Sequence, residues 1–373
     1  MKPGPTARPI RSDVVGSLLR PEYLKAARRR AERGELAPAE LKRIEDRAVD
    51  EAVRLQEAAG LDVVTDGELR RYAFFGHLIE ALDGFDKLGG WAIPFHNDQG
   101  ERLVFQRPVV VDKLRWRRSM CAEELVYLRA RTTRPTKVTL ISTQQAAAYY
   151  DPEKSTGAYP TRDAYLADIV DLTRREVTEL VALGCTYIQI DAPQYAALLD
   201  PELREGYRRR GSDPDRLIDA CIEMDNAVIG AVNHPGVTFG LHICRGNNQS
   251  MFYASGGYEP IAQVFTRSRF QRFLLEYDDQ RSGGFEPLRA MPEDRTVVLG
   301  LVSTKTPRLE STAELRARVE EAARFVPLPR LALSPQCGFA STLEGNRISP
   351  DEQQAKLQRV AQAARLIWKD DDR

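Results

Sequence analysis

The stretch Phe239-Gly-Leu-His-Ile-Cys244 is apolar and carries two soft metal ligands, His242 and Cys244, one residue apart at its end. We expect a β-strand here, in which the side chains at positions i and i+2 point to the same face. An imidazole nitrogen and a thiolate sulfur can then reach one ion without distortion of the backbone. On this spacing alone, the favoured interpretation is a pair of barrel-lining side chains that bind no metal.

Two further apolar runs end in residues that could complete such a site. The run 271–276 ends in the carboxylate of Glu276, and the run 330–337 has Cys337 just past its end. One histidine, two cysteines and a glutamate form a ligand set typical of zinc. Each has an alternative role, because Glu276 could pair with an arginine and Cys337 could be a small buried side chain. The choice depends on whether the fold brings the strand ends together.

Length and composition indicate a globular protein with a large core. The 373 residues are 42% hydrophobic, and we expect one domain over residues 1–373. Lys+Arg and Asp+Glu are equal at 54 each, which favours neither nucleic acid nor a membrane as partner. No apolar run approaches about 18 residues, and the N-terminus lacks the apolar core of a signal peptide. The odd count of five cysteines argues against a disulfide framework and predicts a reducing, cytoplasmic setting.

Eight short apolar runs read as strands and mostly alternate with helical segments. The predicted strands are 12–17, 61–68, 137–142, 186–191, 237–244, 272–276, 295–302 and 331–333. The main predicted helices are 21–35, 38–59, 161–183, 213–233, 313–325 and 350–368. This period predicts an α/β protein with a single (β/α)8 TIM barrel, and the glycine-rich, aromatic stretch 82–116 predicts a β-hairpin insertion after the second strand. A doubly wound open sheet is the alternative, but no Gly-x-Gly-x-x-Gly follows the first strand.

The unusual polar residues fall at or just after the carboxyl ends of these strands, the face that carries the active site in barrel enzymes. They are Ser17, Glu68, Asp191, His242, Cys244, Glu276, Lys305 and Cys337. Ser17 could instead be a turn residue and Asp191 a helix cap. The remaining cysteines, Cys121, Cys185 and Cys221, adjoin helical runs and are expected to be small buried side chains. The remaining histidines, His77, His96 and His234, are expected to be surface or loop residues.

The candidate ligand set constrains the chemistry. Zinc bound by two sulfurs, one nitrogen and one oxygen is a weak Lewis acid for hydrolysis, but it is suited to holding an incoming thiol as a thiolate. Such a sulfur can attack an alkyl carbon. Because four protein ligands fill a tetrahedron, we expect Glu276 to give way to the substrate sulfur.

These residues also match motifs of a known family. The motifs are Val-Gly-Ser17, Thr65-Asp-Gly-Glu68, Ile190-Asp-Ala-Pro193, His242-Ile-Cys244, Glu276 and Cys337-Gly338. The chain resembles the catalytic C-terminal half of cobalamin-independent methionine synthase over nearly its whole length, and is most similar to the short, single-barrel members. The resemblance implies that Zn²⁺ is held by His242, Cys244, Glu276 and Cys337. It further implies that Glu68 and Asp191 hold the amino group of homocysteine and that Ser17 helps to hold its carboxylate.

Three departures from the family bear on the methyl donor. The full-length folate-dependent enzyme has a second, N-terminal barrel that this sequence lacks. Ser142-Thr-Gln144 stands where the family places a tryptophan against the pterin, which weakens the case for a folate donor. Lys305 stands where the family has a proton-donating histidine. Lysine can donate a proton or neutralise an anion, but it is not equivalent to histidine.

The sequence therefore predicts zinc-dependent methyl transfer to a thiol, with homocysteine as the substrate and Lys305 as the group that protonates the departing donor. One alternative is an epoxyalkane:coenzyme M transferase-type reaction, for which Arg70, Arg71, Arg245 and Lys305 could bind the sulfonate. Glu68 and Asp191 would repel that sulfonate. The other is a non-catalytic, zinc-stabilised barrel. The expected partners are a small thiol and a methyl or alkyl donor; the sequence leaves the donor and any oligomer undefined.

Overall fold

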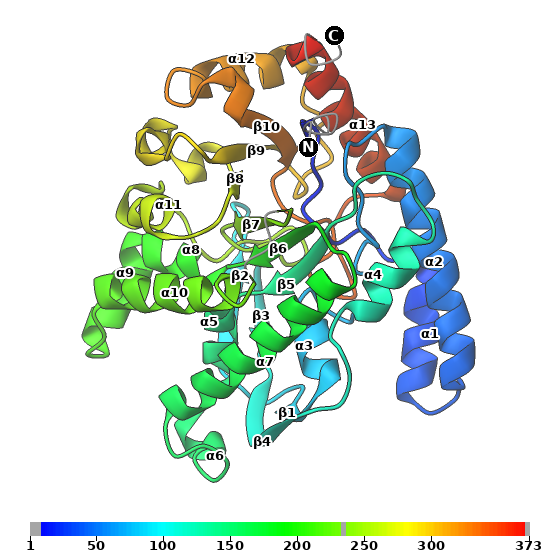
Figure 1. The fold of residues 1–373 in the computed structure, drawn as a ribbon, viewed down its shortest axis with the longest axis vertical. Helices are drawn as coiled ribbons and strands as arrows, with labels where there is room; N and C mark the ends of the chain where they lie inside the picture. The colour runs from blue at the N-terminus through cyan, green and yellow to red at the C-terminus, as the bar shows by residue number, and fades with distance from the viewer. Residues whose placement is uncertain (1–8, 233–235, 370–373) are drawn as a thin grey trace, which may run out of the picture.

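The computed structural model describes residues 9–232 and 236–369, and its centre is a parallel six-stranded sheet with the order β10-β9-β8-β7-β6-β5 (Figure 1). The strands are β5 (Val138–Ile141), β6 (Tyr187–Asp191), β7 (Thr238–Ile243), β8 (Arg272–Glu276), β9 (Thr296–Val302) and β10 (Leu331–Pro335). Each coincides with a predicted strand to within two residues. Nearly every strand residue is buried, as in a parallel sheet that is covered on both faces.

The first two predicted strands, 12–17 and 61–68, are irregular segments with one bridge each. Ser12 bridges Leu333 of β10, and Val64 bridges Thr136 just before β5, both in parallel. Side chains take the backbone donors that a longer ladder would need: Val14 N donates to Asp13 Oδ1, and Thr65 N donates to the side chain of Gln56. The two segments also touch each other, because Asp62 N donates to Ser12 O over 3.2 Å.

Helices cover the outer side of the sheet (Figure 1). They are α1 (Glu22–Glu32), α2 (Pro38–Ala59), α3 (Gly76–Ala81), α4 (Ala122–Arg129), α5 (Thr143–Ala146), α6 (Pro152–Ser155), α7 (Arg162–Ala182), α8 (Gln194–Leu199), α9 (Pro201–Arg209), α10 (Pro214–Ile229), α11 (Gln263–Arg267), α12 (Thr312–Ala322) and α13 (Pro350–Ile367). Short 3₁₀ turns occupy Ala147–Tyr149, Glu259–Ile261, Gln280–Ser282, Glu286–Ala290 and Leu328–Arg330. The long helices agree with prediction. As expected, α2 ends at Gly60, which has a φ of +86°, a conformation that glycine adopts readily.

The apolar core lies between the sheet and these helices, where α12 packs on β9 and α13 packs on β10. A separate small cluster of Val15, Leu274, Val298 and Ala332 fills part of the inner side of the sheet. Capping boxes begin both helices: Ser311 with Glu314 starts α12, and Ser349 with Glu352 starts α13.

The stretch 82–116 forms two antiparallel strand pairs. β1 (Leu82–Asp86) pairs with β4 (Val109–Trp116), and β2 (Ala92–His96) pairs with β3 (Arg102–Gln106). The end of β2 is joined to the loop after β7, because His96 and Phe252 exchange two backbone hydrogen bonds of 2.8 and 2.9 Å. This stretch therefore contacts the loop that follows the two predicted ligands on β7.

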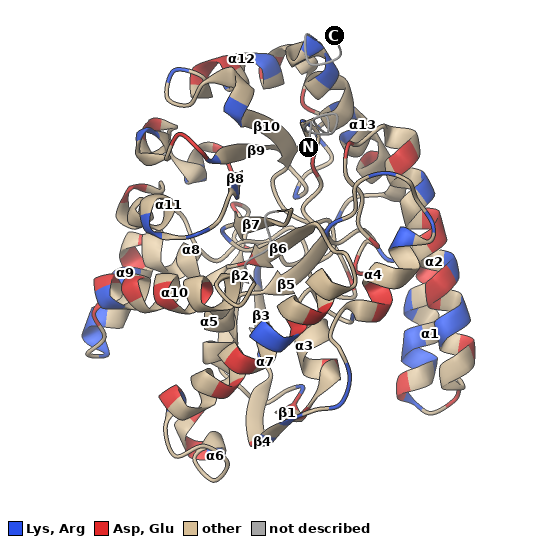
Figure 2. Ribbon diagram, viewed as in Figure 1, with Lys and Arg blue, Asp and Glu red and all other residues tan. Residues whose placement is uncertain are grey.

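Charged side chains of both signs share the outer helices, as Figure 2 shows for α1 and α2. The chain as a whole has equal numbers of acidic and basic residues, 54 of each. Within the described ranges, none of the helices has the length and apolar character needed to cross a membrane.

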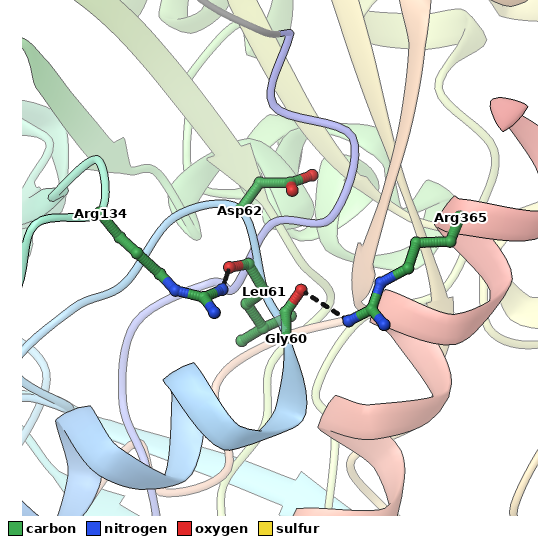
Figure 3. Close-up of a pocket in the computed structure, with 5 residues that line it drawn as sticks. All are labelled: Gly60, Leu61, Asp62, Arg134 and Arg365. Atoms are coloured by element: carbon green, nitrogen blue, oxygen red, sulfur yellow. Dashed lines mark hydrogen bonds between the residues drawn. The ribbon is translucent and has the colours of Figure 1, made fainter. Parts of the chain in front are cut away.

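A pocket of about 340 Å³ lies at the amino end of the segment 61–68 (Figure 3). Gly60, Leu61, Asp62, Arg134 and Arg365 line it. Arg134 donates to Leu61 O, and Arg365 donates to Gly60 O over 3.2 Å. The two arginines thus bond carbonyls at the C-terminal end of α2, which is a structural role.

Candidate metal centre

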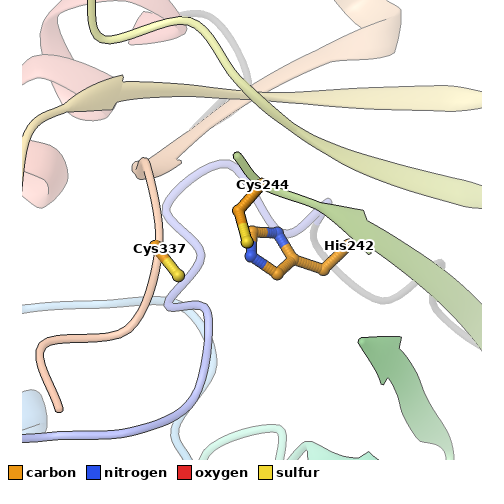
Figure 4. Close-up of side chains that lie close together, drawn as sticks. All are labelled: His242, Cys244 and Cys337. Carbon is orange, nitrogen blue, oxygen red and sulfur yellow. The ribbon is translucent and has the colours of Figure 1, made fainter. Parts of the chain in front are cut away.

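Three of the four predicted ligands converge at the carboxyl ends of β7 and β10 (Figure 4). His242 lies on β7, Cys244 is the first residue after that strand, and Cys337 follows β10 by two positions. One ligand atom from each lies within 4.8 Å of the other two, and all three residues are buried. The parallel strands make this meeting possible because their carboxyl ends share one edge.

The imidazole of His242 is oriented for metal binding. Its Nδ1 lies 3.3 Å from Leu274 O, and a carbonyl oxygen only accepts, so Nδ1 carries the proton. The lone pair then resides on Nε2, which is buried and has no hydrogen-bond partner. Buried polar atoms are rarely left unpartnered, and a metal-bound histidine usually donates its other nitrogen to a carbonyl in this way.

The two thiols differ in acidity. A hydrogen bond from Cys337 and the adjacent His242 hold the pKa of Cys244 well below its usual value. The pKa of Cys337 is raised by the same hydrogen bond and by burial. A thiolate, a second sulfur and an imidazole lone pair are the donors that zinc prefers, so these residues fit the ion.

Glu276 lies beside this cluster and not within it. Its Oε1 is 3.1 Å from Lys305 Nζ, and its Oε2 accepts a 2.7 Å hydrogen bond from Arg245 N. Burial alone would raise the pKa of Glu276, but Lys305 and Arg245 lower it to about 2. The carboxylate is therefore ionised and ion-paired, and its service as fourth ligand stays a prediction.

Lys305 follows β9 and lies between two buried carboxylates. Its Nζ is 3.1 Å from Glu276 Oε1 and 3.6 Å from Asp278 Oδ2. Asp278 belongs to this site, although the sequence analysis did not predict it. Its position two residues after Glu276 was the available signal, because β8 ends there and the following turn faces the same edge of the sheet.

Glu68 and Asp191 are buried carboxyls beside the ligand cluster. Glu68 Oε1 accepts from Thr139 Oγ1 (2.7 Å), whereas its Oε2 is buried without a partner. Asp191 pairs in register with His242 across β6 and β7. Burial raises the pKa of both groups, that of Asp191 to about 7 with a further contribution from Glu68. The two negative charges are thus costly until a cation binds between or beside them.

The backbone at Glu68 is also unusual. Its φ is +55°, in the left-handed region that residues other than glycine seldom adopt. Such strain is concentrated at functional sites. Gly16 allows the close approach, since a Cβ there would lie 2.5 Å from Glu68 Oε1.

Ser17 packs against the loop that carries Cys337. Ser17 O accepts from Phe339 N (2.8 Å), and Ser17 Oγ accepts from Ala340 N (3.4 Å). A side chain at Gly338 would collide with Ser17 Oγ. The serine therefore lies next to the loop of the third ligand, and its role at the substrate carboxylate stays a prediction.

The other cysteines and histidines lie elsewhere. Cys121, Cys185 and Cys221 are buried as expected. The expectation for His77 is wrong: it lies on α3, is 2% exposed, and its Nε2 accepts from Ile141 N because the helix turns the ring toward β5. His96 ends β2 and is exposed, and His234 lies outside the described residues.

Comparison with known proteins identifies the family of the chain. The family described as "Cobalamin-independent synthase, Catalytic domain" matches residues 11–365. The uncharacterized protein YxjH of Bacillus subtilis is 35% identical over 365 residues, which are 97% of this chain and 95% of that protein. Methionine synthase of Pyrococcus abyssi is 24% identical over 360 residues, or 96% and 93% of the two chains.

A solved structure shows the same fold. The putative vitamin-B12 independent methionine synthase from Listeria monocytogenes superposes with a TM-score of 0.71 at 26% identity, over 98% of this chain and 99% of that one. The α/β fold with its parallel sheet is thus shared along the whole length. From the match over residues 11–365, the chain belongs to the cobalamin-independent methionine synthase family, through that family's catalytic domain.

Proposed function

We propose that this protein is a zinc-dependent methyltransferase that transfers a methyl group to the thiol of homocysteine and forms methionine. The observation that carries the proposal is the convergence of His242, Cys244 and Cys337 to within 4.8 Å, with Asp191 directly opposite His242 in the sheet. In this proposal, segments 12–17 and 61–68 complete an eight-stranded barrel between β10 and β5, and 82–116 is an insertion into it.

His242, Cys244 and Cys337 would hold the zinc ion, and Glu276 would be the fourth, exchangeable ligand. When bound, zinc supplies the positive charge that keeps a substrate thiol deprotonated near neutral pH. The chain's own residues hold the rest of the substrate. The ammonium of homocysteine would bind at Glu68 and Asp191, where a cation offsets two buried negative charges. Ser17 would face its carboxylate.

Lys305 would serve the departing methyl donor. Burial alone would lower the pKa of Lys305, but Asp278 and Glu276 raise it, so the side chain keeps its proton and positive charge. That charge stabilises an anion that leaves from the methyl group, or the proton neutralises it. Arg281, whose Nη2 lies 3.9 Å from Glu276 Oε1, is a positively charged neighbour that opposes this rise in the pKa of Lys305.

The polar side chains at 142–144 bear on the donor. Ser142 Oγ donates to Asp225, and Gln144 on α5 donates to Ala220 O over 3.3 Å. These residues are thus engaged in holding α5 against α10, and they offer no aromatic face. We infer a donor whose binding does not depend on stacking at this position.

The coenzyme M alternative requires cations for a sulfonate, and the four candidates are engaged. Arg70 pairs with Asp46 and Arg71 with Glu124, each at 2.6 Å. Arg245 donates to Tyr258 OH over 2.7 Å, and Lys305 pairs with Glu276. A sulfonate would meet Glu68 and Asp191 in place of free cations. The arrangement favours an amino-acid thiol.

The experiment loads the purified protein with cobalt(II) and titrates homocysteine and coenzyme M separately, while the sulfur-to-metal absorption is recorded. A new sulfur ligand with homocysteine alone would support the proposal. A response to coenzyme M alone would replace it with epoxide opening. No response to either, with metal firmly bound, would leave a structural metal in a non-catalytic barrel.

A further inference from the structure

A continuous chain of hydrogen-bonded side chains runs through the inside of the sheet to Asp191. Arg272 Nε on β8 donates to Asp13 Oδ2 over 3.1 Å, and Lys137 Nζ donates to Asp13 Oδ1 over 2.7 Å. Lys137 Nζ also donates to Gln189 Oε1 over 2.7 Å. Gln189 Nε2 then donates to Asp191 Oδ1 over 2.7 Å.

The amide of Gln189 can satisfy this environment in only one orientation. The ammonium of Lys137 only donates, so the amide atom that faces it must be the oxygen. The NH₂ group therefore points the other way, where Asp191 Oδ1 and Val15 O each accept from it at 2.7 Å. A reversed amide would place donor against donor at Lys137 and acceptor against acceptor at Asp191.

At the far end of this hydrogen-bonded series from Asp191, the side chains are held in place. The side chains of Lys137 and Asp13 are 0% exposed, and the lysine also donates to Val14 O. Asp13 receives a further hydrogen bond from Tyr187 OH (3.0 Å). A buried charge whose partners are all satisfied has little freedom to move, because any shift would leave a charge unpaired in a low dielectric.

Asp191 needs such support because its strand ends there. It is the last residue of β6, and the next backbone donor, Ala192 N, bonds to His242 O. Among the described residues, the donor to its carboxylate is Gln189 Nε2. One oxygen is thus held, and the carboxylate can present the other to a ligand.

We propose that Gln189 is a positioning residue for recognition of the substrate amine, and that Lys137 sets the orientation of its amide. Gln189 does not touch the substrate; it fixes the Asp191 carboxylate beside the metal cluster. This inference rests on the proposed function, in which Asp191 holds the ammonium of homocysteine.

The test uses the zinc-loaded protein and Gln189→Met, which keeps the side-chain length and removes both polar atoms. Calorimetric titration gives the Kd of homocysteine and of 4-mercaptobutanoate, which has the same thiol and carboxylate but no amine. We expect the Kd of homocysteine to rise about tenfold or more, as for a lost hydrogen bond to a charged group, and that of 4-mercaptobutanoate to change less than about twofold. Gln353→Met is the matched control, since it removes a buried glutamine that binds Leu19 N (2.7 Å).

Equal changes for both thiols, or no change for either, would overturn the positioning role. A crystal structure of Gln189→Met provides a second readout that needs no substrate: the Asp191 carboxylate should rotate or take two conformers, and an unmoved carboxylate would overturn the inference. Failure of the proposed function is seen separately, as a wild-type protein that does not prefer homocysteine to 4-mercaptobutanoate.

Discussion

Lys305 Nζ lies 3.1 Å from Glu276 Oε1, and the two side chains are only 6% and 0% exposed. The pair joins the loop after β9 to the end of β8, next to the metal cluster. Arg281 Nη2, at 3.9 Å from the same oxygen, is too distant to replace the lysine fully. Loss of either charge would therefore leave the other buried and largely uncompensated.

Replacement of this lysine should destabilise the protein. Lys305→Met leaves the buried Glu276 charge partly uncompensated, so we expect the free energy of unfolding to fall by about 3 to 5 kcal/mol in urea titrations. Arg316→Met is the control, because its partner Glu320 is exposed, and this change should cost no more than about 1 kcal/mol. A loss no larger than the control's would show that the buried pair contributes little.

If His242, Cys244 and Cys337 hold zinc, the zinc content of the protein should depend on each of them. His242→Ala and Cys337→Ser each remove one of three converging ligands, so metal analysis after dialysis against a mild chelator should find the bound zinc largely lost. Cys221→Ser changes a buried cysteine on α10 outside the cluster and should retain the metal. Retention of zinc by both cluster variants would place the metal elsewhere.

Replacement of Glu68 or Asp191 should weaken the binding of homocysteine without loss of the metal. Glu68→Gln and Asp191→Asn remove the charges that would attract an ammonium, so the Kd of homocysteine should rise about tenfold to a hundredfold. Zinc content should be unchanged. Asp163→Asn, on the exposed first turn of α7, should leave the Kd as it is. Unaltered affinity in the first two variants would refute their assignment to the amine.

Asp225 predicts a dependence of stability on pH. It is buried on α10, and although Tyr195 OH and Ser142 Oγ donate to it, burial raises its pKa from 3.8 to about 7. Between these two pKa values, the carboxyl of Asp225 keeps its proton in the folded protein and has lost it in the unfolded chain. The free energy of unfolding therefore falls as pH rises. The loss is on the order of a few kcal/mol between about pH 4 and about pH 8.

Asp225→Asn carries no titrating proton at this position and should flatten that decline. Urea midpoints measured near pH 5 and near pH 8 should differ less in the variant than in the wild type. An unchanged difference would mean that other groups govern this pH range.

Much of the fold could be predicted because β5 to β10 are continuous apolar runs, which buried parallel strands require. The segments 12–17 and 61–68 have the same apolar character. They do not form regular strands, because Asp13 and Gln56 compete for backbone donors there, and periodicity does not report such side-chain bonds. The short helices α5 and α8 were not predicted, since four to six residues hold too little periodic signal.

For the site, strand ends identified which residues could meet, but not their partners. His242, Cys244 and Cys337 do converge. The pairing of Glu276 with Lys305 depends on loop conformation after β9, which has no sequence period. Gln189 had a usable signal, since it lies two residues before Asp191 on the same strand and shares its face.

The separation of the three ligands along the chain orders events during biosynthesis. Cys244 and Cys337 are 93 positions apart (337 minus 244), so at about 5 to 20 residues per second a ribosome reaches the last ligand roughly 5 to 20 seconds after the first two. Ser12 is made earlier still, and its bridge partner Leu333 is absent until near the end of that interval. A nascent chain thus exposes a histidine–cysteine pair before Cys337 is made, so the three-ligand site that we propose for zinc can form only after β10 has been synthesised.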